Sequence, residues 1–458
     1  MGSSAAAKKR IDLILDAGSF MELGENIVAR STDFNMGSGK EPSDGVLTGY
    51  GTVDGRPIYI YSQESKVLGG SLAEMHASKI LRVYEMAKKS GFPIVGLIDC
   101  SGLRLQEGAD ALNSFGKIYK AQAQAKGNIP QITGIFGTCG GGMTFVPALS
   151  DFTFIQDEAA VFVNPAAARP IEADRVDMIL ALNNNPAGDS IADGRGNENE
   201  ICESIRTLLS YLPLSSQEMA PMTPCMDDLN RPGQGLDDAK DDPMAIISEI
   251  VDDGSLFELS KNRASDAITC FARFNGRSVG VIANSGNGYI SSSACEKMAE
   301  FADFCDAFGI AILTLTNAKG FAADNSEENS LPASVAYLLN VFASSDVPKV
   351  NVITGDAIGT AYTVMNSKGL GADFVFAWTN ARVQVMPEMD AVQILYSDEL
   401  SKAPDKNLFL SKKAKEYKEK AGTISFVSRG YIEKVIAPSD TRKYVIGALE
   451  MLSGKLEY

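Results

Sequence analysis

The sequence predicts two α/β domains in tandem, related by duplication of a single domain. Three observations predict this fold class. The chain repeats its own motifs in order, strand-like segments alternate with helical ones, and 458 residues suffice for two hydrophobic cores. A repeat that spans half of the chain indicates a duplicated domain, because solenoid units repeat every ~20–50 residues.

The repeated motifs return in the same order in the second half. The pairs are ILDAGSFMEL (14–23) and IVDDGSLFEL (250–259), VDGR (53–56) and FNGR (274–277), Gly102 and Gly320, and Gly141 and Gly359. The two glycine pairs share one offset in residue number. Two copies of one domain indicate a pseudo-symmetric molecule, and we expect a composite site between the copies.

The sequence between the copies is polar and rich in turn residues. Residues 183–200 are rich in Asn, Asp and Gly, and residues 221–243 in Pro and Asp. We interpret these stretches as surface loops and a linker. The expected domains are residues 1–235, which include the linker, and residues 236–458.

The first copy begins with strand signals and continues with alternating helix and strand. Residues 46–53 and 57–61 predict a β-hairpin, because the Asp54–Gly55 turn adopts positive φ easily. Residues 72–89 carry apolar side chains at helical spacing and end before a glycine. The apolar runs that predict buried strands are 93–98 and 132–136.

The second copy gives the same succession of elements. Its expected elements are a strand over 279–283, a helix over 294–308, and strands over 310–315 and 349–353. A Lys-rich amphipathic helix over 411–420 follows, and its charged face is expected to lie in solvent.

Composition argues against several classes of protein. A net charge of −16 argues against nucleic-acid and anionic-membrane surfaces, which need clustered Lys and Arg. No apolar run approaches the ~18 residues of a membrane span, and the N-terminus lacks the apolar core of a signal peptide. Seven cysteines without close pairs indicate reduced thiols and a cytoplasmic protein. With one histidine and no Cys-x-x-Cys, no metal site is expected.

A few polar residues have two possible roles. His76 would have to supply any Ser-His or Cys-His chemistry, but its place in a helical run favours packing or capping. Arg104, Gln106 and Glu107 follow a predicted strand end, where the sites of α/β proteins gather. A salt bridge at a helix start explains these three equally well, so both roles stay open.

Both copies place a glycine-rich turn between a strand and a helix, over 137–143 and 355–362. The free N–H groups of such a turn stabilise phosphates, or an oxyanion that develops on a carbonyl. Neither turn matches the P-loop pattern or the spacing of a dinucleotide site. Tight packing of strand against helix is the alternative for either turn alone, but recurrence at one offset favours a function.

Several other stretches are typical of one family. They are GYGTVDGRP (49–57), GGSLAEMH (69–76), RLQEG (104–108), PALSDF (147–152), FCDAF (304–308), GADFV (371–375) and RGYI (429–432). In this order they resemble the biotin-dependent acyl-CoA carboxyltransferases, which include propionyl-CoA carboxylase β subunits and methylmalonyl-CoA decarboxylase α subunits. The resemblance covers nearly the whole chain.

The resemblance implies two crotonase-like (ClpP/crotonase) domains, and a hexamer with each site at a dimer interface. It implies that carboxybiotin releases CO2, that the biotin nitrogen takes the α-proton of the acyl-CoA, and that the enolate attacks CO2. Two oxyanions then need stabilisation, by Gly141 and Gly142 at the thioester and by Thr360 and Ala361 at biotin. The residues implied in substrate binding are Gly69, Gly70, Gly102, Arg104, Gln106, Gly320, Phe321 and Thr363.

The chain also departs from the family pattern. Thr360 stands where the family has glycine, and a turn that needs positive φ tolerates threonine poorly. Residues 166–193 replace a longer pocket loop, so the choice of acyl-CoA stays open. Thr363 occupies a position that influences acyl-chain length, but threonine does not specify a length.

Partners follow from what the chain lacks. It contains no biotinyl-lysine motif, so biotin is expected on a separate carrier protein. Nothing in it resembles a biotin carboxylase, so a biotin carboxylase or a membrane decarboxylase subunit is expected as a further partner. The reaction stays open between carboxylation, decarboxylation and transfer between two acceptors.

Two other functions stay open. One is a stand-alone crotonase-type hydratase or hydrolase, for which Glu107 is the one obvious acid–base candidate. The other is a non-catalytic subunit that binds CoA esters and maintains a hexamer.

Overall fold

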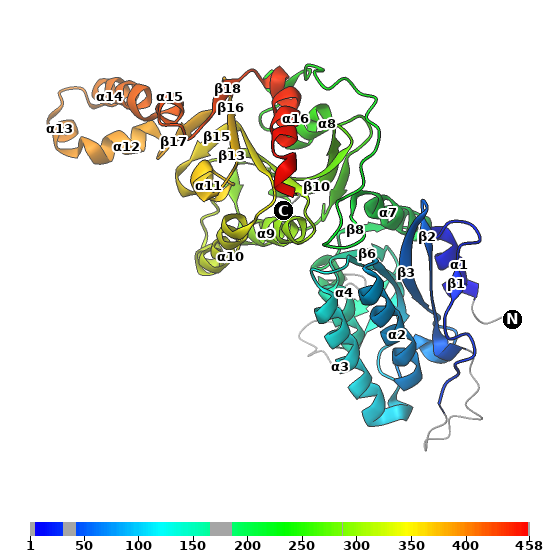
Figure 1. Ribbon diagram of the computed structural model, residues 1–458. Helices are drawn as coiled ribbons and strands as arrows, with labels where there is room; N and C mark the ends of the chain where they lie inside the picture. The colour runs from blue at the N-terminus through cyan, green and yellow to red at the C-terminus, as the bar shows by residue number, and fades with distance from the viewer. Residues whose placement is uncertain (1–4, 31–42, 165–185, 286, 457–458) are drawn as a thin grey trace. The chain divides into compact units, whose positions relative to one another are not determined.

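The computed structural model describes residues 5–30, 43–164, 186–285 and 287–456. The chain folds as two compact units, residues 1–221 and 222–458, and each unit has its own sheet (Figure 1). Both units are mixed α/β, as the sequence predicts.

Among the described residues of the first unit, eight strands form one sheet in the order β1-β2-β3-β4-β5-β6-β8, with β7 beside β5. The pairs β1–β2 and β2–β3 are antiparallel, and the later pairs are parallel. Parallel strands are covered on both faces, which explains why every residue of β4 is buried. The strands span Met21–Glu22 (β1), Val46–Val53 (β2), Arg56–Gln63 (β3), Ile94–Cys100 (β4), Gln131–Gly140 (β5), Phe152–Gln156 (β6), Ala160–Phe162 (β7) and Gly194–Gly196 (β8).

Helices flank this sheet (Figure 1). α2 and α3 pack against each other, and their apolar side chains share a core with β3, β4 and β5. α1 and α7 pack against each other and contact β3, β5 and β6. The helices span Ala5–Ile14 (α1), Glu74–Ser90 (α2), Gly108–Ala125 (α3), Phe145–Leu149 (α4), Pro186–Asp189 (α6) and Glu198–Tyr211 (α7).

The described part of the second unit has a sheet in the order β18-β16-β15-β13-β11-β10-β9, with β17 beside β15, and a separate pair, β12–β14. Its core joins residues of these strands to α8 and α16. The strands span Phe257–Leu259 (β9), Ala267–Phe274 (β10), Arg277–Asn284 (β11), Tyr289–Ile290 (β12), Ala311–Ala318 (β13), Gly320–Phe321 (β14), Lys349–Ile358 (β15), Phe374–Trp378 (β16), Arg382–Gln384 (β17) and Lys434–Ile436 (β18).

The helices of the second unit include a group that projects from its sheet. We call α12 to α15, residues 388–428, the helical extension (Figure 1). The helices span Pro243–Ile250 (α8), Ser292–Ala307 (α9), Asn325–Ser344 (α10), Gly359–Val364 (α11), Glu388–Leu395 (α12), Ser397–Lys402 (α13), Lys406–Ala421 (α14), Thr423–Ser428 (α15) and Thr441–Met451 (α16).

The two sheets share one topology. The strands β9, β10, β11, β13, β15, β16, β17 and β18 have the same neighbours and directions as β1 to β8. The ladder between β4 and β5 shifts register before Cys100, and the ladder between β13 and β15 shifts before Ala318, its repeat position. Lys79 and Lys297 are both buried and donate to backbone carbonyls near the second strand of their sheet. These matches agree with a duplicated domain.

The elements predicted from the sequence are confirmed, with shifted ends. The hairpin is β2–β3, the helices are α2 and α9, and the buried strands are β4, β5, β11, β13 and β15. β5 and β15 run further than predicted, because the short strands β7 and β17 pair with their last residues. The Lys-rich helix is part of α14, in which no residue is buried.

The interpretation of residues 183–200 as a surface loop is wrong for its second half. Residues 194–196 form β8, which pairs with β6 in the sheet, and α7 begins at Glu198. The polar sequence reflects a capping box, in which the Asn197 side chain accepts from the N–H groups of Asn199 and Glu200. Residues 183–185 lie outside the described residues. Residues 166–182, which belong to the segment that replaces the pocket loop, also lie outside them.

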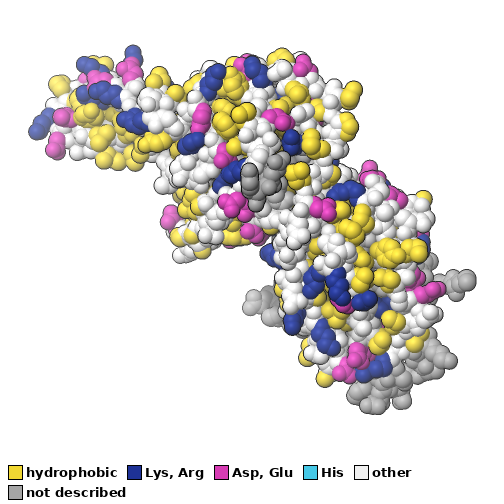
Figure 2. Space-filling model, in the orientation of Figure 1, with side chains coloured by type: hydrophobic (Ala, Val, Ile, Leu, Met, Phe, Trp, Pro, Cys, Tyr) yellow, Lys and Arg dark blue, Asp and Glu magenta, His cyan; other side chains and the backbone are white. Residues whose placement is uncertain are grey.

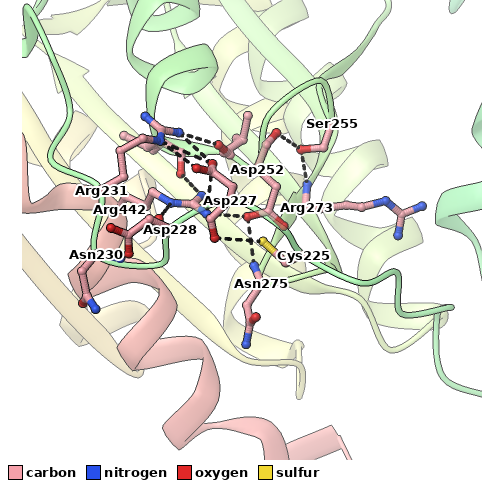
Figure 3. Close-up of polar contacts among 12 residues, drawn as sticks. Cys225, Asp227, Asp228, Asn230, Arg231, Asp252, Ser255, Arg273, Asn275 and Arg442 are labelled. Atoms are coloured by element: carbon pink, nitrogen blue, oxygen red, sulfur yellow. Dashed lines mark hydrogen bonds and ion pairs between the residues drawn. The ribbon is translucent and has the colours of Figure 1, made fainter.

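An ion network around the buried Arg442 anchors the linker to the second unit (Figure 3). Arg442 has no exposed side-chain surface and pairs with Asp252 at 2.7 Å and with Asp227 at 3.3 Å. Arg231 hydrogen-bonds Asp227 and holds the pKa of that carboxyl below its usual range. Residues 222–235 therefore pack with the second unit, whereas the sequence-based boundary assigns them to the first.

Candidate active site

The first glycine-rich turn lies where β5 ends and a helix begins. Gly141 has a φ of +60°, a conformation that favours glycine, and nothing lies within 4 Å of the place that a Cβ would take. Residues 141–144 form a 3-10 turn that leads into α4. Because the first N–H groups of a helical turn have no acceptor within the helix, Gly141 and Gly142 present donors here.

A tyrosine from α3 supports this turn. The Tyr119 hydroxyl donates a hydrogen bond to the Gly142 carbonyl at 2.6 Å, and burial raises the pKa of Tyr119 to about 12. Its ring stacks on Phe115 and meets Phe145 edge-on. A Cβ on Gly142 would lie 2.8 Å from the hydroxyl oxygen, so any larger residue displaces the tyrosine. Sequence reasoning missed Tyr119, and the one available signal was its repeat as Tyr337.

Three glycines predicted to bind substrate, Gly69, Gly70 and Gly102, lie where the loop before α2 meets the ends of β4 and β5. The carbonyls of Gly69 and Gly102 accept backbone hydrogen bonds of 3.0 and 2.8 Å across this junction. Gly70 has a φ of +62°, and a Cβ there would lie 2.1 Å from the Asp99 carbonyl oxygen. A Cβ on Gly102 would lie 3.1 Å from the Gly140 carbonyl oxygen. These glycines therefore permit close contacts between backbones beside the first turn.

The structure places Arg104 and Gln106 in different environments. Gln106 is exposed, whereas the Arg104 guanidinium is buried and pairs with Asp44 and Glu107. It also donates to the Ser71 carbonyl at 2.8 Å. The salt bridge, which was one of the two roles that the sequence allowed for Arg104 and Glu107, is therefore present. Arg104 holds the loop before α2 to the turn that follows β4, and its part in substrate binding stays a prediction.

Glu107 is not placed to act as an acid or base on a substrate. Its side chain is fully buried. One carboxylate oxygen accepts from Arg104 at 3.1 Å, and the other accepts from the Glu74 N–H at 2.9 Å. Because both oxygens have partners inside the unit, the carboxylate does not face a substrate. This geometry argues against a stand-alone hydratase or hydrolase that depends on Glu107.

His76 packs in the interior of the first unit. One ring nitrogen lies 2.9 Å from the Asp44 carbonyl oxygen and the other 3.0 Å from the Gln63 side-chain nitrogen. Burial lowers the pKa of His76 to about 3, so the ring is neutral at physiological pH. The favoured packing role agrees with this environment.

The second unit repeats the glycine turn between β15 and α11. Gly359 has a φ of +61°, whereas Thr360 lies in the first turn of α11 without a positive φ. The replacement of glycine by Thr360 is therefore not strained, contrary to the expectation from the sequence. Thr360 is exposed and Ala361 is buried, and the N–H groups of both lie at the start of the helix.

The other predicted residues of the second unit lie near this turn. Gly320 and Phe321 form β14, which contacts α11, and Thr363 is exposed on α11. Asn317, which sequence reasoning did not select, accepts a hydrogen bond from the Asp356 N–H at 2.8 Å. Its repeat partner Asp99 accepts from the Thr138 N–H at 3.2 Å. In both units one side chain thus holds the strand segment before the glycine turn.

Other kinds of site find little support in the described ranges. No group of three or more His, Cys, Asp or Glu side chains there is arranged to hold a metal ion. None of the helices described is both long and apolar enough to span a bilayer. All seven cysteines are free, and all but Cys225 are buried. Each glycine turn is described within its own unit, so a composite site between the copies stays a prediction.

Comparison with known proteins points to one family. The carboxyl transferase domain matches residues 2–458. A propionyl-CoA carboxylase beta chain from Roseobacter denitrificans is 37% identical, over 98% of this chain and 91% of the relative. A methylmalonyl-CoA decarboxylase subunit alpha from Propionigenium modestum is also 37% identical, over 98% of this chain and 90% of the relative. A hexameric transcarboxylase 12S crystal structure with methylmalonyl-coenzyme A bound has a TM-score of 0.92 at 32% identity, over 98% of this chain and 89% of that chain.

Proposed function

The chain belongs to the carboxyl transferase domain family, and on that premise we propose that it moves a carboxyl group between an acyl-CoA and biotin on a separate carrier protein. The likeness to transcarboxylase 12S confirms the predicted crotonase-like fold. The observation that carries the proposal is the glycine turn at Gly141 and Gly142, which is open at Gly141 and presents backbone donors at the end of β5.

The first turn is suited to the thioester oxygen of the acyl-CoA. Loss of the α-proton moves negative charge onto that oxygen, and the N–H groups of Gly141 and Gly142 then bind it more strongly than in the ground state. A donor of this kind contributes roughly 3 kcal/mol to the stability of the transition state. Tyr119 holds the turn in place without touching the substrate.

The second turn is suited to biotin for the same reason. A Cβ on Gly359 would meet the Val385 carbonyl oxygen at 3.3 Å, so this turn also requires a small residue and a positive φ. The N–H groups of Thr360 and Ala361 would hold the ureido oxygen. Biotin, when bound, supplies or receives the carboxyl group. The chain's own part is to orient both partners, which removes much of the entropic barrier.

The substrate is proposed to be of the propionyl-CoA and methylmalonyl-CoA type. The support is that relatives 37% identical over nearly the whole chain carry these names. Whether the chain serves carboxylation or decarboxylation depends on its partner. A biotin carboxylase would favour the first reaction and a membrane decarboxylase subunit the second.

The assembly is proposed to be a homo-oligomer, most simply a hexamer as in transcarboxylase 12S. Five large apolar side chains of the first unit are exposed in the single chain, and a partner surface would cover them. They are Leu105, Leu112, Phe145, Leu149 and Val163. Light scattering at micromolar concentration is expected to give the mass of a hexamer, and a monomer would contradict the proposal.

Turnover tests the proposed function directly. The purified chain is incubated with methylmalonyl-CoA, with and without free biotin or a biotinylated carrier, and propionyl-CoA is measured. Product is expected only when biotin is present, and a streptavidin blot is expected not to label the chain. Hydration or hydrolysis of the CoA ester without biotin would favour the stand-alone crotonase. Binding of the ester without turnover would favour the non-catalytic subunit.

A further inference from the structure

The ladder between β4 and β5 is interrupted just before the first glycine turn. Between two regular pairs of this ladder, Asp99 alone lies opposite residues 136–138 of β5. A bulge of this kind bends its strand, and bulges are common beside active sites, where they re-aim the chain. β5 pairs with β6 before the bulge and with β7 after it. The bulge therefore sets the direction in which β5 enters the glycine turn.

The Asp99 side chain fills this bulge. Its Oδ1 accepts from the Thr138 N–H at 3.2 Å, and a Cβ on Gly137 would lie 2.3 Å from the same oxygen, which requires glycine there. The other carboxylate oxygen accepts from the Ser65 hydroxyl at 2.8 Å and lies 3.4 Å from the Arg10 guanidinium. Asp and Glu side chains are common at the surface of the protein (Figure 2), but Asp99 is 7% exposed and both of its oxygens have partners.

The second sheet has the same bulge, filled by a neutral amide. Between two regular pairs of the ladder from β13 to β15, Asn317 alone lies opposite residues 354–356. Its Oδ1 accepts from the Asp356 N–H at 2.8 Å, and a Cβ on Gly355 would lie 2.4 Å from that oxygen. Its Nδ2 donates to the Lys240 carbonyl at 2.9 Å. An amide thus does in the second unit what a carboxylate beside a cation does in the first.

We propose that Asp99 and Asn317 are positioning residues, each of which fixes the direction of the glycine turn that follows its bulge. This inference rests on the proposed function, in which the first turn binds the thioester oxygen and the second binds the biotin oxygen. Backbone donors stabilise an oxyanion most when they are held in place before it forms. A strand end that is free to move therefore lowers the rate more than it weakens substrate binding. Neither side chain touches a substrate in this role.

Hydrogen exchange of the free, full-length protein tests this role without turnover. Peptides that cover residues 137–143 and 355–362 are followed by mass spectrometry. Asp99→Leu is expected to speed exchange at least about tenfold in the first segment alone, and Asn317→Leu in the second segment alone. Each variant is the matched control for the other. Exchange that stays as in the parent, or that rises equally throughout the unit, would overturn the proposal.

Turnover separates positioning from general stability. With methylmalonyl-CoA and free biotin, Asp99→Leu is expected to lower kcat about fivefold or more, while KM for the CoA ester stays within about twofold. Unchanged kcat in the folded variant, or a loss that lies in KM alone, would contradict the role of Asp99. A parent protein without turnover would contradict the proposed function instead, and the exchange experiment would still decide whether these side chains order the turns.

The amide of the second bulge provides a rescue for the first. Arg10→Met leaves the buried Asp99 carboxylate without the nearby guanidinium and is expected to lower kcat. The double variant Arg10→Met/Asp99→Asn gives the first bulge a neutral amide, whose oxygen accepts from the Thr138 N–H and whose NH2 group donates to the Ser65 hydroxyl. We expect it to recover most of the kcat that Arg10→Met loses and the slow exchange of residues 137–143. A double variant no better than Arg10→Met would overturn the proposal.

Discussion

The hydroxyl of Tyr119 donates a hydrogen bond of 2.6 Å to the carbonyl oxygen of Gly142. This bond ties α3 to the turn after β5 and fixes the plane of the peptide that joins Gly142 to Met143. The backbone donors of the turn therefore depend on a side chain from another element of the first unit.

Replacement of this tyrosine tests its role as a positioning residue. Tyr119→Phe keeps the ring between Phe115 and Phe145 but removes the bond to Gly142. We expect kcat to fall about fivefold with KM within about twofold, since a net hydrogen bond contributes ~1 kcal/mol and acts here on the transition state. The control is Tyr337→Phe, the repeat position in the second unit, which is expected to keep kcat. A rise in KM at unchanged kcat would contradict the positioning role.

Gly142→Val is expected to abolish turnover while the fold and assembly persist. A Cβ at this position would lie 2.8 Å from the Tyr119 hydroxyl, and a branched side chain would fill the space that the thioester needs. Loss of a donor of this kind lowers the rate about a hundredfold or more. Turnover, light scattering and thermal melting are compared with those of Gly447→Ala, where a Cβ meets nothing within 4 Å. A folded hexamer with normal turnover would exclude an oxyanion role for this turn.

Arg104→Met is expected to destabilise the first unit by about 3–5 kcal/mol, because it leaves the carboxylates of Asp44 and Glu107 buried without their cation. Denaturant unfolding measures the loss. The matched control is Arg82→Met, which breaks an exposed pair with Glu85 and is expected to cost less than about 1 kcal/mol. Similar losses in both variants would contradict the structural role of Arg104.

The same variant has a predicted pH dependence. Burial raises the pKa of Asp44, so the folded state takes up a proton there before the unfolded state does as the pH falls. Protonation removes the unpaired charge, and the deficit of Arg104→Met is therefore expected to shrink as the pH is lowered from 7. A deficit that grows on acidification would contradict this assignment.

His76 is expected to make the protein less stable in mild acid. Burial lowers the pKa of His76 from 6.5 to about 3, so below pH ~6.5 the unfolded chain binds a proton that the folded chain does not. Stability is lost as the pH falls through this window, by up to about 1.4 kcal/mol per pH unit. Urea unfolding at pH 7, 6 and 5 is expected to show a shallower dependence for His76→Gln than for the parent. Equal dependence in both would show that the imidazole titrates normally.

The local pattern of the sequence determined the elements and the duplication. Hydrophobic spacing and turn residues act over a few positions, which is why the hairpin β2–β3, the helix α2 and the strand β4 could be predicted. The glycine turns at Gly141 and Gly359 could also be predicted from the sequence. The backbone has a positive φ at both positions, and glycine adopts this conformation most easily, so both copies have glycine there.

Only the tertiary structure decided which residues meet across elements. The burial of Arg104 between Asp44 and Glu107, the bond from Tyr119 to Gly142, and the pairing of residues 194–196 with β6 join positions far apart in the chain. The same holds for the ion network of Arg442 that places the linker with the second unit. The spacing of residues along a short segment does not determine such contacts. They form only when the whole chain packs and the free energy gained by burial outweighs the entropy lost in closing the loops between the contacting residues.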